Sequence, residues 1–315
     1  MSPLVDFGWV ANAEAVGEWN EFSFLSDQAS ELGLSSAVPP VRRVALGGGV
    51  SALAWGERPA TVVALHGVAL NAHTWDETLL GLAASNPAAE AAYLAIDLPG
   101  HGDSAWRADA DYTPATLAPA LATAFNNAIR AGLLAPDFSL VGHSLGGLVA
   151  LAQLQHRIAG FSRLILVDIL PLNPVAARAV AAFLDGPSSF DSREQIVQRA
   201  VEFGFGGSRT SLERAVLLNT RADRAGRVAW KHHLGVLGGK GVPLSDPFPL
   251  WEVLAHARVP IDLIAATVSM VDDAAIEQLV RLRPQARVVR VAGGHNLQED
   301  SPAALTAALI EYLRR

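Results

Sequence analysis

The fold is decided at residues 138–150, which read Phe138-Ser139-Leu140-Val141-Gly142-His143-Ser144-Leu145-Gly146-Gly147-Leu148-Val149-Ala150. An apolar run rich in strand-forming residues ends at Gly142, and apolar residues at helical spacing begin at Leu145. Between them lies the pattern Gly-x-Ser-x-Gly. A strand that turns directly into a helix holds the middle serine on a tight, strained turn, with its hydroxyl group projecting above the helix N-terminus. The pattern therefore makes Ser144 a candidate nucleophile.

The composition is that of a chain with a sizeable buried core. Of 315 residues, 50% are hydrophobic and 17% are charged. The net charge of −7, without a long basic run, argues against binding to nucleic acid or to an anionic membrane surface. The absence of cysteine excludes disulfides, thiol catalysis and thiolate metal sites, and it fits a reducing compartment.

The N-terminus lacks the features of a secretory signal. Residues 1–10 carry Asp6 and no Lys or Arg. No uncharged apolar stretch reaches the roughly 20 residues that a membrane span needs. We therefore expect a cytoplasmic protein without a membrane partner, and the sequence gives no indication of its oligomeric state.

Residues 1–40 form an N-terminal extension. Residues 11–34 have helical character, and Pro39-Pro40 closes the segment. One interpretation is a helix that packs on the main domain. The alternative is a flap that lends aromatic side chains to a pocket (Trp9, Trp19, Phe22 and Phe24).

Residues 41–170 and 251–315 alternate short apolar strands with helices. Continuous apolar strands in such an order indicate a mostly parallel sheet that is covered on both faces. Strands are predicted at 41–46, 50–55, 61–65, 92–96, up to 141, 163–167, 261–265 and 287–291, and helices at 74–84, 113–131, from 144, 273–282 and 302–315.

Residues 171–250 break this alternation. The interval begins with Pro171 and Pro174, contains an Ala-rich helical stretch at 175–183, and shows no strand pattern. It is predicted to be a helical lid, inserted after a strand end on the Ser144 side of the sheet.

A serine nucleophile needs a base, and its reaction needs N–H donors for the oxyanion. His295, in Val291-Ala292-Gly293-Gly294-His295-Asn296, is the candidate base, because it alone of the nine histidines follows a terminal strand through a Gly-Gly turn. The candidate oxyanion donors are the backbone N–H groups of Leu145, at the helix N-terminus, and Val68, in the loop after Leu65.

Together these segments resemble the alpha/beta-hydrolase superfamily, in the lid-bearing branch that includes small esterases, lactonases and carbon–carbon bond hydrolases. The resemblance rests on Leu65-His66-Gly67, Trp75, the turn from Asp97 to Ser104, the Ser144 motif and Gly294-His295, and it spans residues 41–315 in the family's order. It implies an eight-stranded, mostly parallel sheet with helices on both faces and an inserted helical lid. The fold hosts many chemistries, so the resemblance does not name a substrate.

The resemblance also bears on several histidines, and the predicted lid supplies aromatic residues. It implies that the turn from Asp97 to Ser104 is structural, so that His101 is not catalytic. The predicted substrate-binding side chains come from the first loop, the serine motif and the lid: His73, His143, Phe183 and Trp230.

The acid of the triad is where this chain departs from the family. In relatives the acid commonly follows the strand equivalent to 261–265, about four residues beyond it, but this chain has Ser269 there. Some family members place the acid one strand earlier, at the position of Asp168. Asp272 and Asp273 are expected to cap the next helix, and they remain the alternatives.

We therefore predict a cofactor-independent, metal-free serine hydrolase that cleaves an ester or lactone of a small or medium apolar substrate through an acyl-enzyme. Ser144 is the predicted nucleophile, His295 the base and Asp168 the acid. Carbon–carbon bond hydrolysis and acyl transfer would use the same triad. A cofactor-free oxygenase on this fold would not need Ser144, and a non-catalytic binding protein could tolerate loss of triad members.

Overall fold

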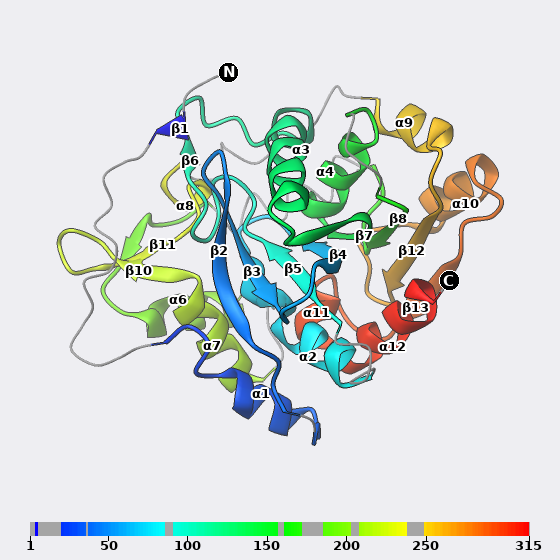
Figure 1. Cartoon of the computed structure of the whole chain (residues 1–315). Coiled ribbons are helices and arrows are strands. Elements are labelled where there is room, and N and C mark those ends of the chain that lie inside the picture. The colour runs from blue at the N-terminus through cyan, green and yellow to red at the C-terminus, as the bar shows by residue number, and fades with distance from the viewer. Residues whose placement is uncertain are drawn as a thin grey trace.

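The computed structural model describes residues 4–5, 20–35, 37–85, 91–156, 161–171, 185–202, 208–237 and 249–314. A central sheet of eight strands runs through it, with helices above and below (Figure 1). The strand order is β13-β12-β8-β7-β4-β5-β3-β2. The strands are β2 (Val41–Gly47), β3 (Val50–Trp55), β4 (Ala60–Leu65), β5 (Tyr93–Ile96), β7 (Leu134–His143), β8 (Arg163–Val167), β12 (Ile261–Ala266) and β13 (Val288–Val291).

The sheet is mostly parallel, as the sequence predicts. Only β3 runs antiparallel to its neighbours, β2 and β5, and the remaining pairs are parallel. Across the centre of the sheet, Gly142 of β7 pairs with Leu65 of β4 and Leu166 of β8. The residues that follow these three strands therefore meet at one edge of the sheet.

Helices cover both faces of the sheet (Figure 1). Val63 and Leu65 of β4 belong to the core with α3 and α4, whereas Val62 and Ala64 belong to the core with α2 and α12. Burial on both faces explains why the strands read as continuous apolar runs. One layer contains α3 (Pro114–Arg130), α4 (Leu145–Gln153), α9 (Leu250–His256) and α10 (Asp273–Leu282); the other contains α1 (Leu25–Glu31), the short η1 (Ala72–Trp75), α2 (Asp76–Ser85), α11 (Leu297–Asp300) and α12 (Pro302–Leu313).

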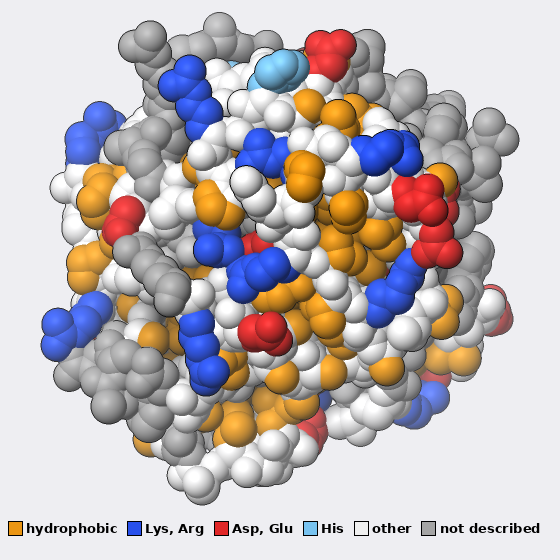
Figure 2. Space-filling model, turned by 90° about the vertical axis from the view of Figure 1, so that its right-hand side faces the viewer, with side chains coloured by type: hydrophobic (Ala, Val, Ile, Leu, Met, Phe, Trp, Pro, Cys, Tyr) orange, Lys and Arg blue, Asp and Glu red, His pale blue; other side chains and the backbone are white. Residues whose placement is uncertain are grey.

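The edge strand β13 is flanked by arginines in ion pairs. Arg287 contacts the buried Asp262 at 2.6 Å, and Arg290 contacts Asp273. Figure 2 shows the molecule from the side on which β13 and α10 lie, with basic side chains scattered among apolar ones. Charged side chains beside an edge strand disfavour pairing with another chain.

Residues 20–35 of the N-terminal extension pack on the main domain. Helix α1 lies against α2, and Glu21 contacts Arg43 of β2 at 2.7 Å. The predicted helix over 11–34 is observed only as α1, since 6–19, with Trp9 and Trp19, lie outside the described residues. Near the start of the chain, β1 (Leu4–Val5) pairs with β6 (Trp106–Arg107).

The insertion between β8 and α9 is not purely helical, so the prediction of a strand-free interval is wrong. Besides the helices α6 (Arg193–Glu202), α7 (Arg209–Leu218) and α8 (Leu234–Leu237), it contains a small antiparallel sheet in the order β10-β11-β9. Its strands are β9 (Ser189–Phe190), β10 (Thr220–Ala222) and β11 (Val228–Trp230). Strands of two or three residues are too short to show the alternation by which sequence reveals a strand.

A buried arginine ties the insertion to two other parts of the molecule. Arg214 of α7 contacts Glu31 of α1 at 2.9 Å and Glu77 of α2 at 3.5 Å. Its side chain is only 7% exposed, so both contacts are made at the inner surface of the insertion. Helices α1, α2 and α7 are thereby held together.

Buried histidines also join the insertion to the core. His66 and His101 lie with ring centroids 5.2 Å apart, and His232 of the insertion lies 6.2 Å from His101. Burial lowers the pKa of His66 to about 4 and that of His101 to about 3. The His66 ring is fixed as the neutral tautomer, because Nδ1 donates to the carbonyl of Gly67 and Nε2 accepts from the amide of Leu98.

No helix within the described ranges combines the length and the apolar character that a bilayer crossing requires.

The first prediction concerns the contact between α4 and the loop after β4. Replacing a helical glycine by alanine normally stabilises a helix. At Gly146 the new Cβ would lie 2.5 Å from the carbonyl oxygen of Leu65, a backbone atom. We expect Gly146→Ala to lower the free energy of unfolding by about 1–3 kcal/mol, as overpacking does, in urea denaturation. An unchanged or raised stability would contradict this close contact.

The second prediction concerns acid stability. Below pH 6.5 the unfolded chain protonates His66 and His101, whereas the folded protein keeps both neutral until about pH 4 and 3. The unfolded state then binds more protons, so stability falls as the pH falls. We expect these two groups to remove about 3 kcal/mol from the free energy of unfolding between pH 6.5 and 5. Chemical denaturation at stepped pH measures this loss, and a flat profile over that window would show that the histidines are not buried as neutral groups.

Candidate active site

Ser144 occupies the turn between β7 and α4. Its backbone has φ 50° and ψ −121°, in a region that residues other than glycine rarely adopt, at a cost of roughly 1–3 kcal/mol. Close backbone packing holds it there: a Cβ on Gly142 would lie 2.6 Å from the Cα of Gly147. The serine is 7% exposed and lines a cavity at the edge of the sheet.

Asp168 follows β8 directly and also has a positive φ, of 48°. Its carboxylate is fully buried, and Oδ2 lies 2.8 Å from Nδ1 of His295. Oδ1 accepts from the amide of Ala266 at 2.7 Å and from the hydroxyl of Ser269 at 2.5 Å. The structure therefore brings the predicted acid and the predicted base together.

The hydrogen bonds to Asp168 keep it charged. Burial alone would raise the pKa of Asp168, but the hydrogen bonds from His295, Ser269 and Ala266 outweigh burial and lower it. The sequence marks Ser269 only as a position that lacks the expected carboxylate. The structure shows that it donates to the carboxylate on the neighbouring strand instead.

The alternative acids lie elsewhere. Asp272 is the N-cap of α10 and accepts from the amide of Ala275 at 2.8 Å, which confirms the predicted cap. Asp273 is exposed and contacts Arg290. Neither carboxylate makes a hydrogen bond or ion pair with His295 in the described structure.

His295 directs its second nitrogen away from Asp168. Since Nδ1 is held by the carboxylate, Nε2 lies on the opposite edge of the ring; it is buried and has no hydrogen-bond partner among the described residues. His295 lines the same cavity as Ser144.

The loop after β4 lies against the serine turn. The amide of Gly146 donates to the carbonyl of His66 at 3.0 Å, and a Cβ on Gly67 would lie 3.1 Å from the Cβ of Ser144. Val68 lines the cavity, and Leu145 is the first residue of α4. The two predicted oxyanion donors thus come from segments that are in direct contact.

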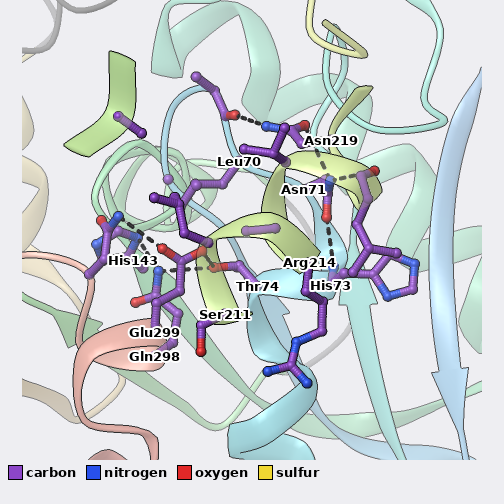
Figure 3. A pocket seen from close by; sticks show the side chains of 18 of the residues that line it. Leu70, Asn71, His73, Thr74, His143, Ser211, Arg214, Asn219, Gln298 and Glu299 are labelled. Atoms are coloured by element: carbon purple, nitrogen blue, oxygen red, sulfur yellow. Dashed lines mark hydrogen bonds between the residues drawn. The ribbon is translucent and has the colours of Figure 1, made fainter. Parts of the chain in front are cut away.

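The cavity lies between the sheet edge and the insertion, and its volume is about 170 Å³. Its insertion side is largely apolar, with Ile196, Leu212, Val216, Leu218 and Trp230. The insertion also supplies Ser211, Arg214 and Asn219 to the lining. The residues that line the cavity from the main domain are more polar and include Glu77, together with Thr74, Gln298 and Glu299, which are labelled in Figure 3. A ligand would therefore meet two walls of different character.

The predicted substrate-binding residues have different outcomes. His143 and Trp230 line the cavity, and so does His73. Phe183 lies outside the described residues. Gln28 is the described residue of the N-terminal extension that lines the cavity. Phe22 and Phe24, two of the aromatic residues of the predicted flap, do not line it.

His143 supports the loop that carries His295. Its Nε2 lies 2.9 Å from the backbone carbonyl of His295, and its Nδ1 lies 3.4 Å from Nε2 of Gln298. Burial, together with the nearby His295, holds the pKa of His143 well below its ordinary value. The ring is therefore neutral: Nε2–H donates to the carbonyl, and Nδ1 accepts from Gln298.

His73 is held between two carboxylates. Nδ1 lies 2.8 Å from Asp76 and Nε2 lies 3.2 Å from Glu21. Although burial opposes protonation, these carboxylates raise the pKa of His73 to about 9. The stability that this contact contributes is present below pH 6.5 and is lost as the pH rises through 9. Both ring nitrogens are thus occupied by protein groups.

Sequence reasoning missed Thr74, Gln298 and Glu299, which line the cavity near His143. They belong to η1 and to the short helix α11, and no motif marks them. Among the residues that the structure describes, no group of three or more His, Cys, Asp or Glu side chains is arranged to hold a metal ion.

The chain is similar in sequence to two known proteins. The chain is 34% identical over 303 residues to esterase Rv0045c from Mycobacterium tuberculosis (strain ATCC 25618 / H37Rv), a match that covers 91% of this chain and 93% of that protein. It is 24% identical over 226 residues to the sn-1-specific diacylglycerol lipase ABHD11 from Mus musculus, covering 70% of this chain and 71% of that protein.

Solved structures give the same result. A structure of the M. tuberculosis esterase Rv0045c has a TM-score of 0.79 at 30% identity, and the match covers 95% of this chain and 100% of that one. The structure of E-2-(acetamidomethylene)succinate hydrolase has a TM-score of 0.73 at 20% identity, covering 88% and 100%, and shows the fold alone. The sequence model of the Alpha/beta hydrolase family matches residues 62–309. The fold of this chain, its serine turn and these matches together show that the chain belongs to the alpha/beta hydrolase family.

Proposed function

We propose that this protein is a serine esterase that works through an acyl-enzyme, with Ser144 as nucleophile, His295 as base and Asp168 as the orienting acid. The observation that carries the proposal is the 2.8 Å contact between Asp168 and Nδ1 of His295, which leaves Nε2 free beside the cavity that Ser144 lines. This is the arrangement that a serine nucleophile needs.

In the first half of the reaction, Nε2 of His295 takes the proton of the Ser144 hydroxyl while Oγ attacks the ester carbonyl. Asp168 holds the tautomer in which Nδ1 carries hydrogen, and it stabilises the imidazolium that forms. The amides of Val68 and Leu145 donate to the oxyanion. Each such donor typically contributes about 3 kcal/mol to transition-state stabilisation.

The imidazolium then gives its proton to the oxygen of the leaving alcohol as the ester C–O bond breaks, and the acyl group stays on Ser144. In the second half, a water molecule attacks the acyl-enzyme while His295 takes its proton. His295 returns that proton to Oγ of Ser144 as the acyl–Oγ bond breaks, which releases the acid and restores the serine. No metal or organic cofactor takes part in this proposed reaction.

The substrate that fits is a small molecule with a compact apolar part. A cavity of about 170 Å³ is close to the size that holds one benzene-sized group. The apolar insertion wall suits an acyl chain of a few carbons. The relatives support ester chemistry, because one is described as an esterase and the other as a diacylglycerol lipase. A lactone would react through the same steps.

We also propose that the insertion acts as a lid over Ser144, within the predicted limits 171–250. The support is that residues of α6 and α7 line the same cavity as Ser144 and His295. The predicted cytoplasmic location and the absence of a nucleic-acid partner stay predictions.

The nucleophile is tested by Ser144→Ala. We expect turnover of 4-nitrophenyl butyrate to fall by at least about 10⁴-fold, since removing a triad member leaves only binding and the oxyanion donors. The circular dichroism spectrum should be unchanged. In the same test a fluorophosphonate should add one label to the wild type and none to the variant, as read by intact mass. A variant that kept most of its activity would rule out the acyl-enzyme on Ser144 and favour a histidine-based reaction, in which His295 activates water for direct attack on the ester.

The acid is tested by comparing Asp168→Asn with Asp272→Asn. Loss of the orienting carboxylate typically costs about 10⁴ in kcat, so Asp168→Asn should be severely impaired. Asp272→Asn is the matched control: its rate should be nearly normal, with less than about 1 kcal/mol lost from the cap of α10. Steady-state kinetics and thermal unfolding of both variants give the answer, and the reverse pattern of rates would assign the acid to the later strand.

A further inference from the structure

The wall of the cavity beside His295 is a hydrogen-bonded network of three side chains. Thr74 Oγ1 donates to Oε1 of Glu299 at 2.7 Å. Nε2 of Gln298 donates to Thr74 Oγ1 at 3.2 Å and to Nδ1 of His143 at 3.4 Å. Figure 3 shows Thr74, Gln298 and Glu299 close together beside His143. All four residues line the cavity.

The hydrogen atoms of the Thr74 hydroxyl and the Gln298 amide are all used in bonds within this network, whereas oxygen atoms of Gln298 and Glu299 can still accept hydrogen bonds. The Thr74 hydroxyl has given its hydrogen to Glu299, and the Gln298 amide has used both of its own. Glu299 accepts one further bond, from Nδ2 of Asn296 at 3.2 Å, so two of the four positions on a carboxylate are filled. Gln298 is 1% exposed, and its Oε1 has no partner within the described residues.

Glu299 forms no ion pair with any described residue, and each of its two oxygens accepts one hydrogen bond from the protein. Arg214, a cation that lines the same cavity, is paired with Glu31 and Glu77 instead. Burial raises the pKa of Glu299, against the hydrogen bond from Thr74, and a further hydrogen bond donated by a ligand would stabilise the ionised carboxylate. The acceptor positions left on Glu299 and Gln298 therefore favour a ligand group that donates a hydrogen bond.

The chemistry of the triad indicates which part of an ester meets this wall. His295 must give its proton to the leaving alcohol, so the alcohol lies on the His295 side of the scissile bond. Asn296, which follows His295 in the chain, donates to Glu299 at 3.2 Å, and all three residues line the cavity. The alcohol part is therefore the part next to Glu299.

Resting on the proposed ester hydrolysis, we propose that Glu299, supported by Thr74 and Gln298, is the subsite for the alcohol part of the substrate, and that this alcohol carries a second hydroxyl group which donates to Glu299. The substrate class is then the ester of a short acid with a diol or polyol. Glu299 is a specificity-determining residue in this assignment, and it takes no part in proton transfer.

The test uses two esters that differ only in the terminal group of the alcohol. Butyl butyrate ends in a methyl group, and 3-hydroxypropyl butyrate has a hydroxyl in its place. The readout is the ratio of their kcat/KM values, which cancels any general effect of a variant on the triad or on folding. In the wild type the ratio should favour the hydroxy ester. A hydrogen bond to a charged group corresponds to about tenfold or more, so Glu299→Met should lower the ratio by about that factor.

Two further variants sharpen the test. Glu299→Gln keeps one acceptor oxygen and should lower the ratio by less than Glu299→Met does. Glu277→Gln removes an exposed carboxylate on α10, outside the cavity, and should leave the ratio at the wild-type value. A fluorophosphonate titration counts the active sites in each preparation, so that every ratio refers to folded enzyme.

The outcomes separate this inference from the proposed function. If both esters are cleaved and Glu299→Met leaves the ratio unchanged, the subsite assignment is wrong and the esterase proposal stands. If 2-(trimethylammonio)ethyl butyrate is preferred to the hydroxy ester, the site recognises charge, and the hydroxyl assignment is overturned. If neither ester is cleaved and Ser144 takes no label, the proposed function itself fails.

Discussion

The contact on which the site depends is made between backbone atoms. The amide of Gly146, in the first turn of α4, donates to the carbonyl of His66, and no side chain fits between the two segments. This contact fixes the distance between the serine turn and the loop that carries Val68. The contact uses no side-chain atoms and requires only the absence of a Cβ at Gly146. Substitutions at neighbouring positions can therefore leave the position of Ser144 unchanged. The strained φ of Ser144 is maintained by the same packing.

The carboxylate beside His295 is supported by the neighbouring strand. Asp168 stands after β8, and Ser269 stands after β12. The Ser269 hydroxyl donates to Asp168, so the segment after β12 supplies a hydrogen bond to the carboxylate after β8. The negative charge at Nδ1 of His295 is kept. The left-handed backbone of Asp168 accompanies this placement, directly after the end of β8.

The sheet, the order of strands and helices along the chain, and the positions of Ser144 and His295 could be predicted from sequence, because each depends on local periodicity or on a short motif. No motif marks Asp168, and its prediction rested on the resemblance to family members that carry the acid after the equivalent strand. The three strands of the insertion could not, since two or three residues carry no period. Thr74, Gln298 and Glu299 were missed because they meet only after η1 and α11 fold against each other. Gln28 of α1 was missed for a similar reason, since it lines the cavity only after α1 packs against α2.

The N-terminal helix α1 allows the substrate pocket to change in evolution separately from the catalytic residues. Residues 20–35 precede the family-matched region 62–309, yet Gln28 forms part of the cavity wall and Glu31 contacts Arg214 of the insertion. Glu21 of this segment contacts Arg43 of β2, whereas no described residue of 20–35 is hydrogen-bonded or ion-paired to the serine turn. Substitutions in this helix can therefore reshape the pocket while the catalytic scaffold remains intact, so that selectivity and rate can evolve on separate segments of the chain.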